Sequence, residues 1–157
     1  MTLMTGRTMH IAIIIIALMT FFQFHPPAAE SAGIDWYSHE KGLVLGKSQA
    51  KKVFINFYAT WCGYCKMMDT KTFTDSSVIA YMKNNFIAVK VDVDKERQVA
   101  AMYNISPLPD VWFISEKGAP IGNKPGYIPA KDMLQVLKFI HTDSYLKMSF
   151  MQFLDTQ

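Results

Sequence analysis

Residues 53–66 carry the sequence VFINFYATWCGYCK, and this stretch decides the fold. Its first six residues are mostly apolar and rich in β-branched and aromatic side chains, which predicts a buried strand over 53–58. The chain then turns, and a helical pattern runs from Tyr64 to about Thr72. Two cysteines lie three residues apart where this helix begins, so a single turn can bring their sulfur atoms within bonding distance. The stretch therefore predicts a strand, a turn and a helix that together present a pair of thiols.

The two cysteines have unequal positions on the predicted helix. The sulfur of Cys62, in the first turn, lies near unpaired backbone N–H groups and the positive end of the helix dipole. These features stabilise a thiolate and should lower the pKa of the Cys62 thiol from about 8.5 toward about 3.5–7.5. Cys65, one turn later, is more shielded. We therefore expect Cys62 to attack a substrate disulfide and Cys65 to release the resulting mixed disulfide.

Strands and helices alternate along the rest of the chain. Period-two alternation and compact apolar runs mark the strands, and apolar residues recurring at three and four mark the helices. This order predicts an α/β fold with a mixed sheet and helices on both faces. The expected strands are 53–58, 87–93, 111–115 and a short one near Ile121; the expected helices are 34–50, 64–72, one capped by Asp75 or Ser76, 95–103 and one opened by Pro129.

Some side chains have expected places within these elements. Trp36 and Tyr37 would lie on the apolar face of the first helix, and Met67 and Met68 would pack into the core. The tail after Ser144 is apolar, so it either prolongs the last helix or covers an edge of the sheet.

The N-terminus has the layout of a secretory signal peptide. Arg7 precedes the largely apolar run Ile11–Phe24, and small residues follow. At about 1.5 Å per residue this run covers ~21 Å as a helix, which is short of the ~30 Å hydrocarbon core. We therefore predict a signal peptide over 1–29 and a domain over 30–157 with its core at about 34–140. An uncleaved membrane anchor is the alternative.

Composition excludes several classes of protein. The 157 residues are 50% hydrophobic and 18% charged, with a net charge of +3, which suits one globular domain and indicates no nucleic-acid partner. Two cysteines are too few for a disulfide-stapled miniprotein or a four-cysteine zinc site. The predicted domain has two histidines, His39 and His141, and both lie far from the cysteine pair in sequence. A disulfide that closes a four-residue loop constrains the unfolded chain little and would stabilise the fold little. Redox activity is therefore favoured over a purely structural disulfide.

With these features, the chain resembles thioredoxin over roughly 34–140. The resemblance rests on the WCxxC motif after an apolar strand, a βα unit, a proline loop over 103–109, and a final hairpin and helix. Within the superfamily, the chain is most similar to the C-terminal periplasmic domain of DsbD-type disulfide reductases and to small exported thioredoxin-like proteins. The resemblance implies that Pro109 is the family's cis-proline. Together with Leu108 and Trp61, it would form an apolar groove for an extended protein segment.

One position departs from the family pattern. Thioredoxins generally carry a buried aspartate in the strand before the motif, and the corresponding residue here is Asn56. An amide cannot accept the proton of the second cysteine at neutral pH. Asp69, one turn after Cys65, is the nearest alternative acid, although its spacing equally fits an ordinary solvated helix residue. Lys90 matches a lysine that lies near the buried acid in thioredoxins, or it is simply an outward-facing strand residue.

These features predict an exported, periplasmic or secreted, thiol–disulfide oxidoreductase. It would use the Cys62–Cys65 pair, without cofactor or metal, to reduce disulfides of exported proteins. We expect a monomer that a membrane thiol reductase recharges. Gly63-Tyr64 is the dipeptide of DsbC-type isomerases, so an oxidase or isomerase is an alternative within the enzyme class. A non-enzymatic chaperone or a Cu(I)-binding module is the alternative outside it. Asp110, which follows Pro109, either tunes substrate choice or hydrogen-bonds its own loop.

Overall fold

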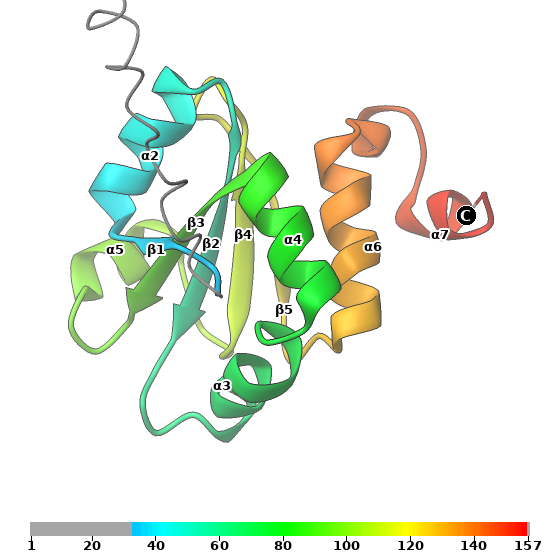
Figure 1. The fold of residues 1–157 in the computed structure, drawn as a ribbon. Helices are drawn as coiled ribbons and strands as arrows, with labels where there is room; N and C mark the ends of the chain where they lie inside the picture. The colour runs from blue at the N-terminus through cyan, green and yellow to red at the C-terminus, as the bar shows by residue number, and fades with distance from the viewer. Residues whose placement is uncertain (1–32, 157) are drawn as a thin grey trace, which may run out of the picture. The chain divides into compact units, whose positions relative to one another are not determined.

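The computed structural model describes residues 33–156, and the predicted signal peptide lies outside them. Five strands form one sheet in the order β1-β3-β2-β4-β5 (Figure 1). The strands β1, β3 and β2 are parallel, whereas β4 runs antiparallel to β2, and β5 runs antiparallel to β4. The sheet is therefore mixed, as predicted. The strands are β1 (Trp36–Tyr37), β2 (Lys52–Tyr58), β3 (Phe86–Asp92), β4 (Asp110–Ile114) and β5 (Pro120–Pro125).

Helices cover both faces of this sheet, which confirms the predicted architecture (Figure 1). On β2, the side chain of Phe54 packs with α4 and α6, whereas Ile55 and Phe57 pack toward α2 and α5. Because successive side chains of a strand point to opposite faces, one apolar strand contributes to both cores. The helices are α2 (His39–Ser48), α3 (Gly63–Met67), the π-helical η1 (Met68–Thr72), α4 (Ser76–Asn85), α5 (Arg97–Met102), α6 (Ala130–His141), the 3₁₀ turn η2 (Ser144–Leu146) and α7 (Phe150–Leu154).

The start of the domain differs from the prediction. Trp36 and Tyr37 are not helical but form β1, which pairs with Ala88 and Val89 of β3. The helix begins only at His39. Pairing with a neighbouring strand depends on residues about fifty positions away, so the local spacing of apolar residues could not reveal it.

The segment after the cysteines also differs in detail. Met68 is buried as predicted, but Met67 is 39% exposed, so its predicted place in the core is wrong. The wide π turn of η1 is closed by the Phe73 amide donating to the Met68 carbonyl. Asp75, not Ser76, caps α4 by accepting hydrogen bonds from the Ser77 and Val78 amides.

The C-terminal tail does not prolong α6. Asp143 adopts a left-handed conformation (φ 57°) directly after the Thr142 that ends the helix, and the chain turns there. The rings of Phe150 and Phe153 then lie 5.3 Å from the ring of Phe139 on α6. None of the helices within residues 33–156 combines the length and the hydrophobicity needed to span a bilayer.

Candidate active site

The two cysteines lie where β2 gives way to α3, and they form a disulfide with their Cα atoms 5.3 Å apart. A turn after β2 is closed by the Cys62 amide, which donates to the Ala59 carbonyl at 3.2 Å. Cys62 is then the N-cap of α3, and its Sγ accepts a hydrogen bond from the Cys65 amide at 3.1 Å. An N–H group at the first turn of the helix therefore points at the sulfur of Cys62.

Burial differs only slightly between the two cysteines. Cys62 is 6% exposed and Cys65 is 3% exposed. Both pack in a small apolar cluster with Ala59, to which Tyr58, Val93 and Leu108 contribute. The low exposure of both cysteines confines their chemistry to a partner that docks directly on this surface.

Two aromatic side chains project beside the disulfide. Trp61 is 68% exposed, and its indole N–H donates to the Asp94 carboxylate at 2.8 Å. Tyr64 is also exposed and stacks on Tyr127, with the ring centroids 6.4 Å apart. Asp94 and Tyr127 were not among the residues expected at this site. Asp94 follows β3, which runs parallel to β2. Both strands end at the same edge of the sheet, so this order could have predicted that Asp94 lies near the cysteines. No sequence signal pointed to Tyr127.

The loop before β4 reaches the same cluster. The Leu108–Pro109 peptide bond is cis, and Leu108 packs with the cysteines. The Pro109 carbonyl accepts a hydrogen bond from the Gly126 amide at 2.7 Å, which ties the loop to the end of β5. The structure thus brings Trp61, Leu108 and Pro109 to the surroundings of the disulfide, although the Pro109 side chain is itself buried.

The residues predicted to support proton transfer lie near one another. Lys90 is the cross-strand neighbour of Asn56, yet its ammonium donates to Asp69 on η1 at 2.7 Å. The same ammonium lies 4.6 Å from the centre of the Tyr58 ring. Asn56 is only 2% exposed, and its Oδ1 has no hydrogen-bond partner among the described residues. The structure therefore joins Asp69 to Lys90 and leaves the amide oxygen of Asn56 alone.

Asp110 is buried directly after the cis-proline and accepts hydrogen bonds from two neighbouring side chains and from the Val111 backbone. The Trp112 indole donates to it at 3.1 Å, and the Asn123 amide donates at 3.2 and 3.0 Å. Burial raises the pKa of Asp110. Of the two interpretations of this residue, hydrogen bonding within its own hairpin is present in the structure. Among residues 33–156, no group of three His, Cys, Asp or Glu side chains could hold a metal ion.

Comparison with known sequences identifies relatives of this domain. The profile of a thioredoxin-like domain family matches residues 40–141. A thioredoxin from Mycoplasmoides gallisepticum is 35% identical over 91 residues, which cover 58% of this chain and 86% of the relative. A thiol:disulfide interchange protein DsbD from Vibrio vulnificus is 29% identical over 107 residues, which cover 64% of this chain but only 18% of the relative.

Solved structures agree with the sequence relatives. A thioredoxin from Thermus thermophilus superposes with a TM-score of 0.63 at 25% identity, covering 69% of this chain and 87% of that one. A DsbH oxidoreductase superposes with a TM-score of 0.57 at 20% identity, covering 82% of this chain and 94% of that one. At that identity, the second likeness concerns the fold alone.

Proposed function

The chain belongs to the thioredoxin-like domain family, and on this premise we propose that it reduces disulfide bonds in exported proteins. It is a thiol–disulfide oxidoreductase whose CxxC pair is Cys62 and Cys65. The observation that carries the proposal is the hydrogen bond from the Cys65 amide to the sulfur of Cys62 at the start of α3. A donor held in this place stabilises a thiolate at Cys62 and assigns it the role of nucleophile.

The proposed reaction has two exchange steps. The Cys62 thiolate attacks one sulfur of a substrate disulfide, forms a mixed disulfide and releases the other substrate sulfur as a thiolate, which takes a proton from solvent. Cys65 then loses its proton and attacks the Cys62 sulfur. This step forms the Cys62–Cys65 disulfide, and the second substrate thiolate leaves. Two electrons have moved from the enzyme to the substrate.

The proton of Cys65 needs an acceptor, and Asp69 is the acid we assign to it. Asp69 follows Cys65 by four residues and is held by the Lys90 ammonium. Asn56, in contrast, is uncharged at every pH of interest. The ion pair with Lys90 holds the Asp69 carboxylate in place. Both residues are supporting groups in this proposal, and neither is a nucleophile.

Substrate binding is assigned to the surface around the disulfide. Trp61 is exposed and held by Asp94, while Leu108 and Pro109 form the facing loop. Among the described residues, no backbone group hydrogen-bonds to the Leu108 amide or carbonyl. Unpaired backbone groups can pair with an extended segment of a substrate, and exposed apolar side chains can bind its residues. The partner would therefore be an extended, disulfide-bearing segment of an exported protein.

Export to the periplasm or beyond and recharging by a membrane thiol reductase belong to the same proposal. Both are supported by the apolar run Ile11–Phe24 and by the similarity to DsbD. No cofactor is required, because the cysteine pair itself stores the electrons.

A Cys65→Ala variant tests the roles of the two cysteines and identifies substrates. Without Cys65 the mixed disulfide on Cys62 cannot be resolved, so covalent partners should accumulate in cells. The matched Cys62→Ala variant should trap none, since the nucleophile is absent. Equal trapping by both variants, or trapping by neither, would contradict the assignment of Cys62.

The reduction potential tests the direction of electron flow. A value near that of thioredoxin, about −270 mV, is expected for a reductase. A value near about −120 mV would instead identify an oxidase and overturn the proposed direction.

A further inference from the structure

Asp110 is a buried carboxylate that forms no ion pair with any of residues 33–156. It is 3% exposed, and the side chains that donate to it, Trp112 and Asn123, are both neutral. None of the ion pairs among the described residues involves Asp110. Each of these donors is an N–H group, and N–H donors stabilise the ionised carboxylate relative to the neutral acid.

Such an arrangement is costly for stability. Burying a carboxylate destabilises the folded state unless the charge is compensated, and burial accordingly raises the pKa of Asp110. An asparagine of the same shape could make equivalent hydrogen bonds, because the Asn123 amide can turn and offer its oxygen. A charge retained where a neutral residue would fit is a candidate for a functional role.

The place of Asp110 connects it with the cysteines. It lies at the start of β4, opposite Phe57 near the end of β2, which is the edge of the sheet where Cys62 follows. It also directly follows the Leu108–Pro109 loop, and Leu108 packs against the small cluster that contains the two cysteines. The charge therefore lies in a low-dielectric region at the same edge as the redox pair, where electrostatic effects are screened weakly.

We propose that Asp110 biases the Cys62–Cys65 pair toward giving up electrons, because its buried negative charge disfavours the Cys62 thiolate. The disulfide form carries no charge on Cys62, so the carboxylate repels only the reduced form. A pair whose reduced form is destabilised is a stronger reductant, just as a stabilised reduced form makes an oxidant. This inference rests on the proposed function and deepens it, since it names a residue that sets the direction.

The test compares wild type with Asp110→Asn at equilibrium with glutathione, together with a titration of the Cys62 thiolate by its ultraviolet absorbance. We expect the equilibrium constant to shift about threefold or more toward the dithiol, and the pKa of the Cys62 thiol to fall. The unfolding midpoint of the oxidised variant should not fall. As a control, Asp132→Asn makes the same change on the exposed first turn of α6 and should alter neither quantity.

An unchanged or opposite shift in Asp110→Asn would overturn the inference. So would a lower unfolding midpoint with an unchanged equilibrium, because that result describes a purely structural residue. If this variant does not fold, Asp110→Ser removes the same charge and is measured in the same way. The absolute potential of the wild type tests the proposed function, whereas the difference between wild type and variant tests Asp110, so the two can fail separately.

Discussion

At the scale of single residues, the position of Asn56 shapes the site. A buried carboxylate there would compete for the ammonium of Lys90, its neighbour across the strands. The amide cannot compete with a carboxylate for a cation, and Lys90 pairs with Asp69 on the helical segment after the cysteines. The acid assigned to proton transfer therefore comes from η1 and not from the sheet.

The variant Asp69→Asn tests this assignment. It keeps the shape of the side chain but cannot accept a proton, so release of substrate from the mixed disulfide should slow by about 10-fold or more. Attack by Cys62 should be unaffected. The measurement is stopped-flow or quenched kinetics of the two steps with a peptide disulfide, with Asp132→Asn as the control. If the release of substrate is unchanged, Asp69 does not accept the proton of Cys65 and serves only in its ion pair with Lys90.

At the scale of elements, α2 lies against the sheet through two glycines. A Cβ atom on Gly42 would collide with the Val89 side chain, and one on Gly46 would collide with Val53. The absence of side chains at these two positions allows the helix backbone to approach β3 and β2 closely. Close packing of this helix supports the face of the sheet opposite the one covered by α4 and α6.

The variant Gly42→Ala should destabilise the protein by about 1–3 kcal/mol, which is typical of overpacking. Alanine favours helix formation, so this result would be opposite in sign to the intrinsic propensity. Gly122→Ala is the matched control, because a Cβ there meets nothing within 4 Å. Chemical denaturation measures both variants. A Gly42 variant as stable as wild type would show that α2 can move away from the sheet.

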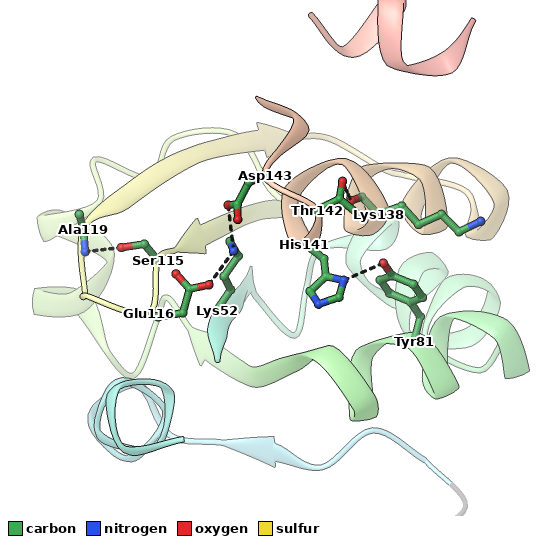
Figure 2. Close-up of polar contacts among 9 residues, drawn as sticks. All are labelled: Lys52, Tyr81, Ser115, Glu116, Ala119, Lys138, His141, Thr142 and Asp143. Atoms are coloured by element: carbon green, nitrogen blue, oxygen red, sulfur yellow. Dashed lines mark hydrogen bonds and ion pairs between the residues drawn. The ribbon is translucent and has the colours of Figure 1, made fainter. Parts of the chain in front are cut away.

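At the scale of the whole domain, one buried lysine connects three distant segments at the end of β2 remote from the cysteines (Figure 2). The ammonium of Lys52 contacts Glu116, after β4, at 2.6 Å and Asp143, after α6, at 3.0 Å. Nearby, the Tyr81 hydroxyl and His141 are hydrogen-bonded at 3.0 Å, which joins α4 to α6. These contacts hold the sheet and the α4–α6 layer together at this end.

The loss of stability on breaking these ion pairs depends on whether Lys52 or its two partners are replaced. A Glu116→Gln/Asp143→Asn double variant leaves a buried, unpaired ammonium and should cost up to about 3–5 kcal/mol. Lys52→Met removes the buried charge, replaces it with an apolar chain and should cost less than about 1 kcal/mol. Urea denaturation of both variants measures the difference. Equal losses of stability in the two variants would show that the buried, unpaired ammonium is not the main source of the cost.

The same cluster predicts a dependence of stability on pH. The hydrogen bond from Lys52 lowers the pKa of Glu116. A carboxyl group with a lowered pKa contributes stability above its ordinary pKa of about 4.3, and this contribution is lost as the pH falls through the folded-state pKa. Acid should therefore destabilise wild type more than Lys52→Met, as measured by thermal unfolding between neutral and acidic pH.

The sequence by itself determined the redox pair and most of the fold. The i, i+3 spacing of Cys62 and Cys65, the apolar run of β2 and the helical periodicities are local patterns, and local patterns follow directly from backbone geometry. The resemblance carried by WCxxC and the proline loop added the cis bond before Pro109. Asp69 and Lys90 could be named as candidates, but their pairing could not be read from the spacing.

Only the tertiary structure decided which distant residues meet. The hydrogen bond from Trp61 to Asp94, the stacking of Tyr64 on Tyr127, the pairing of β1 with β3 and the exposure of Met67 all depend on long-range packing. Such contacts are selected by the sum of many weak interactions and not by any pattern along the chain. The same holds for Asp110, since its burial and its hydrogen bond with Asn123 exist only once β4 and β5 have paired.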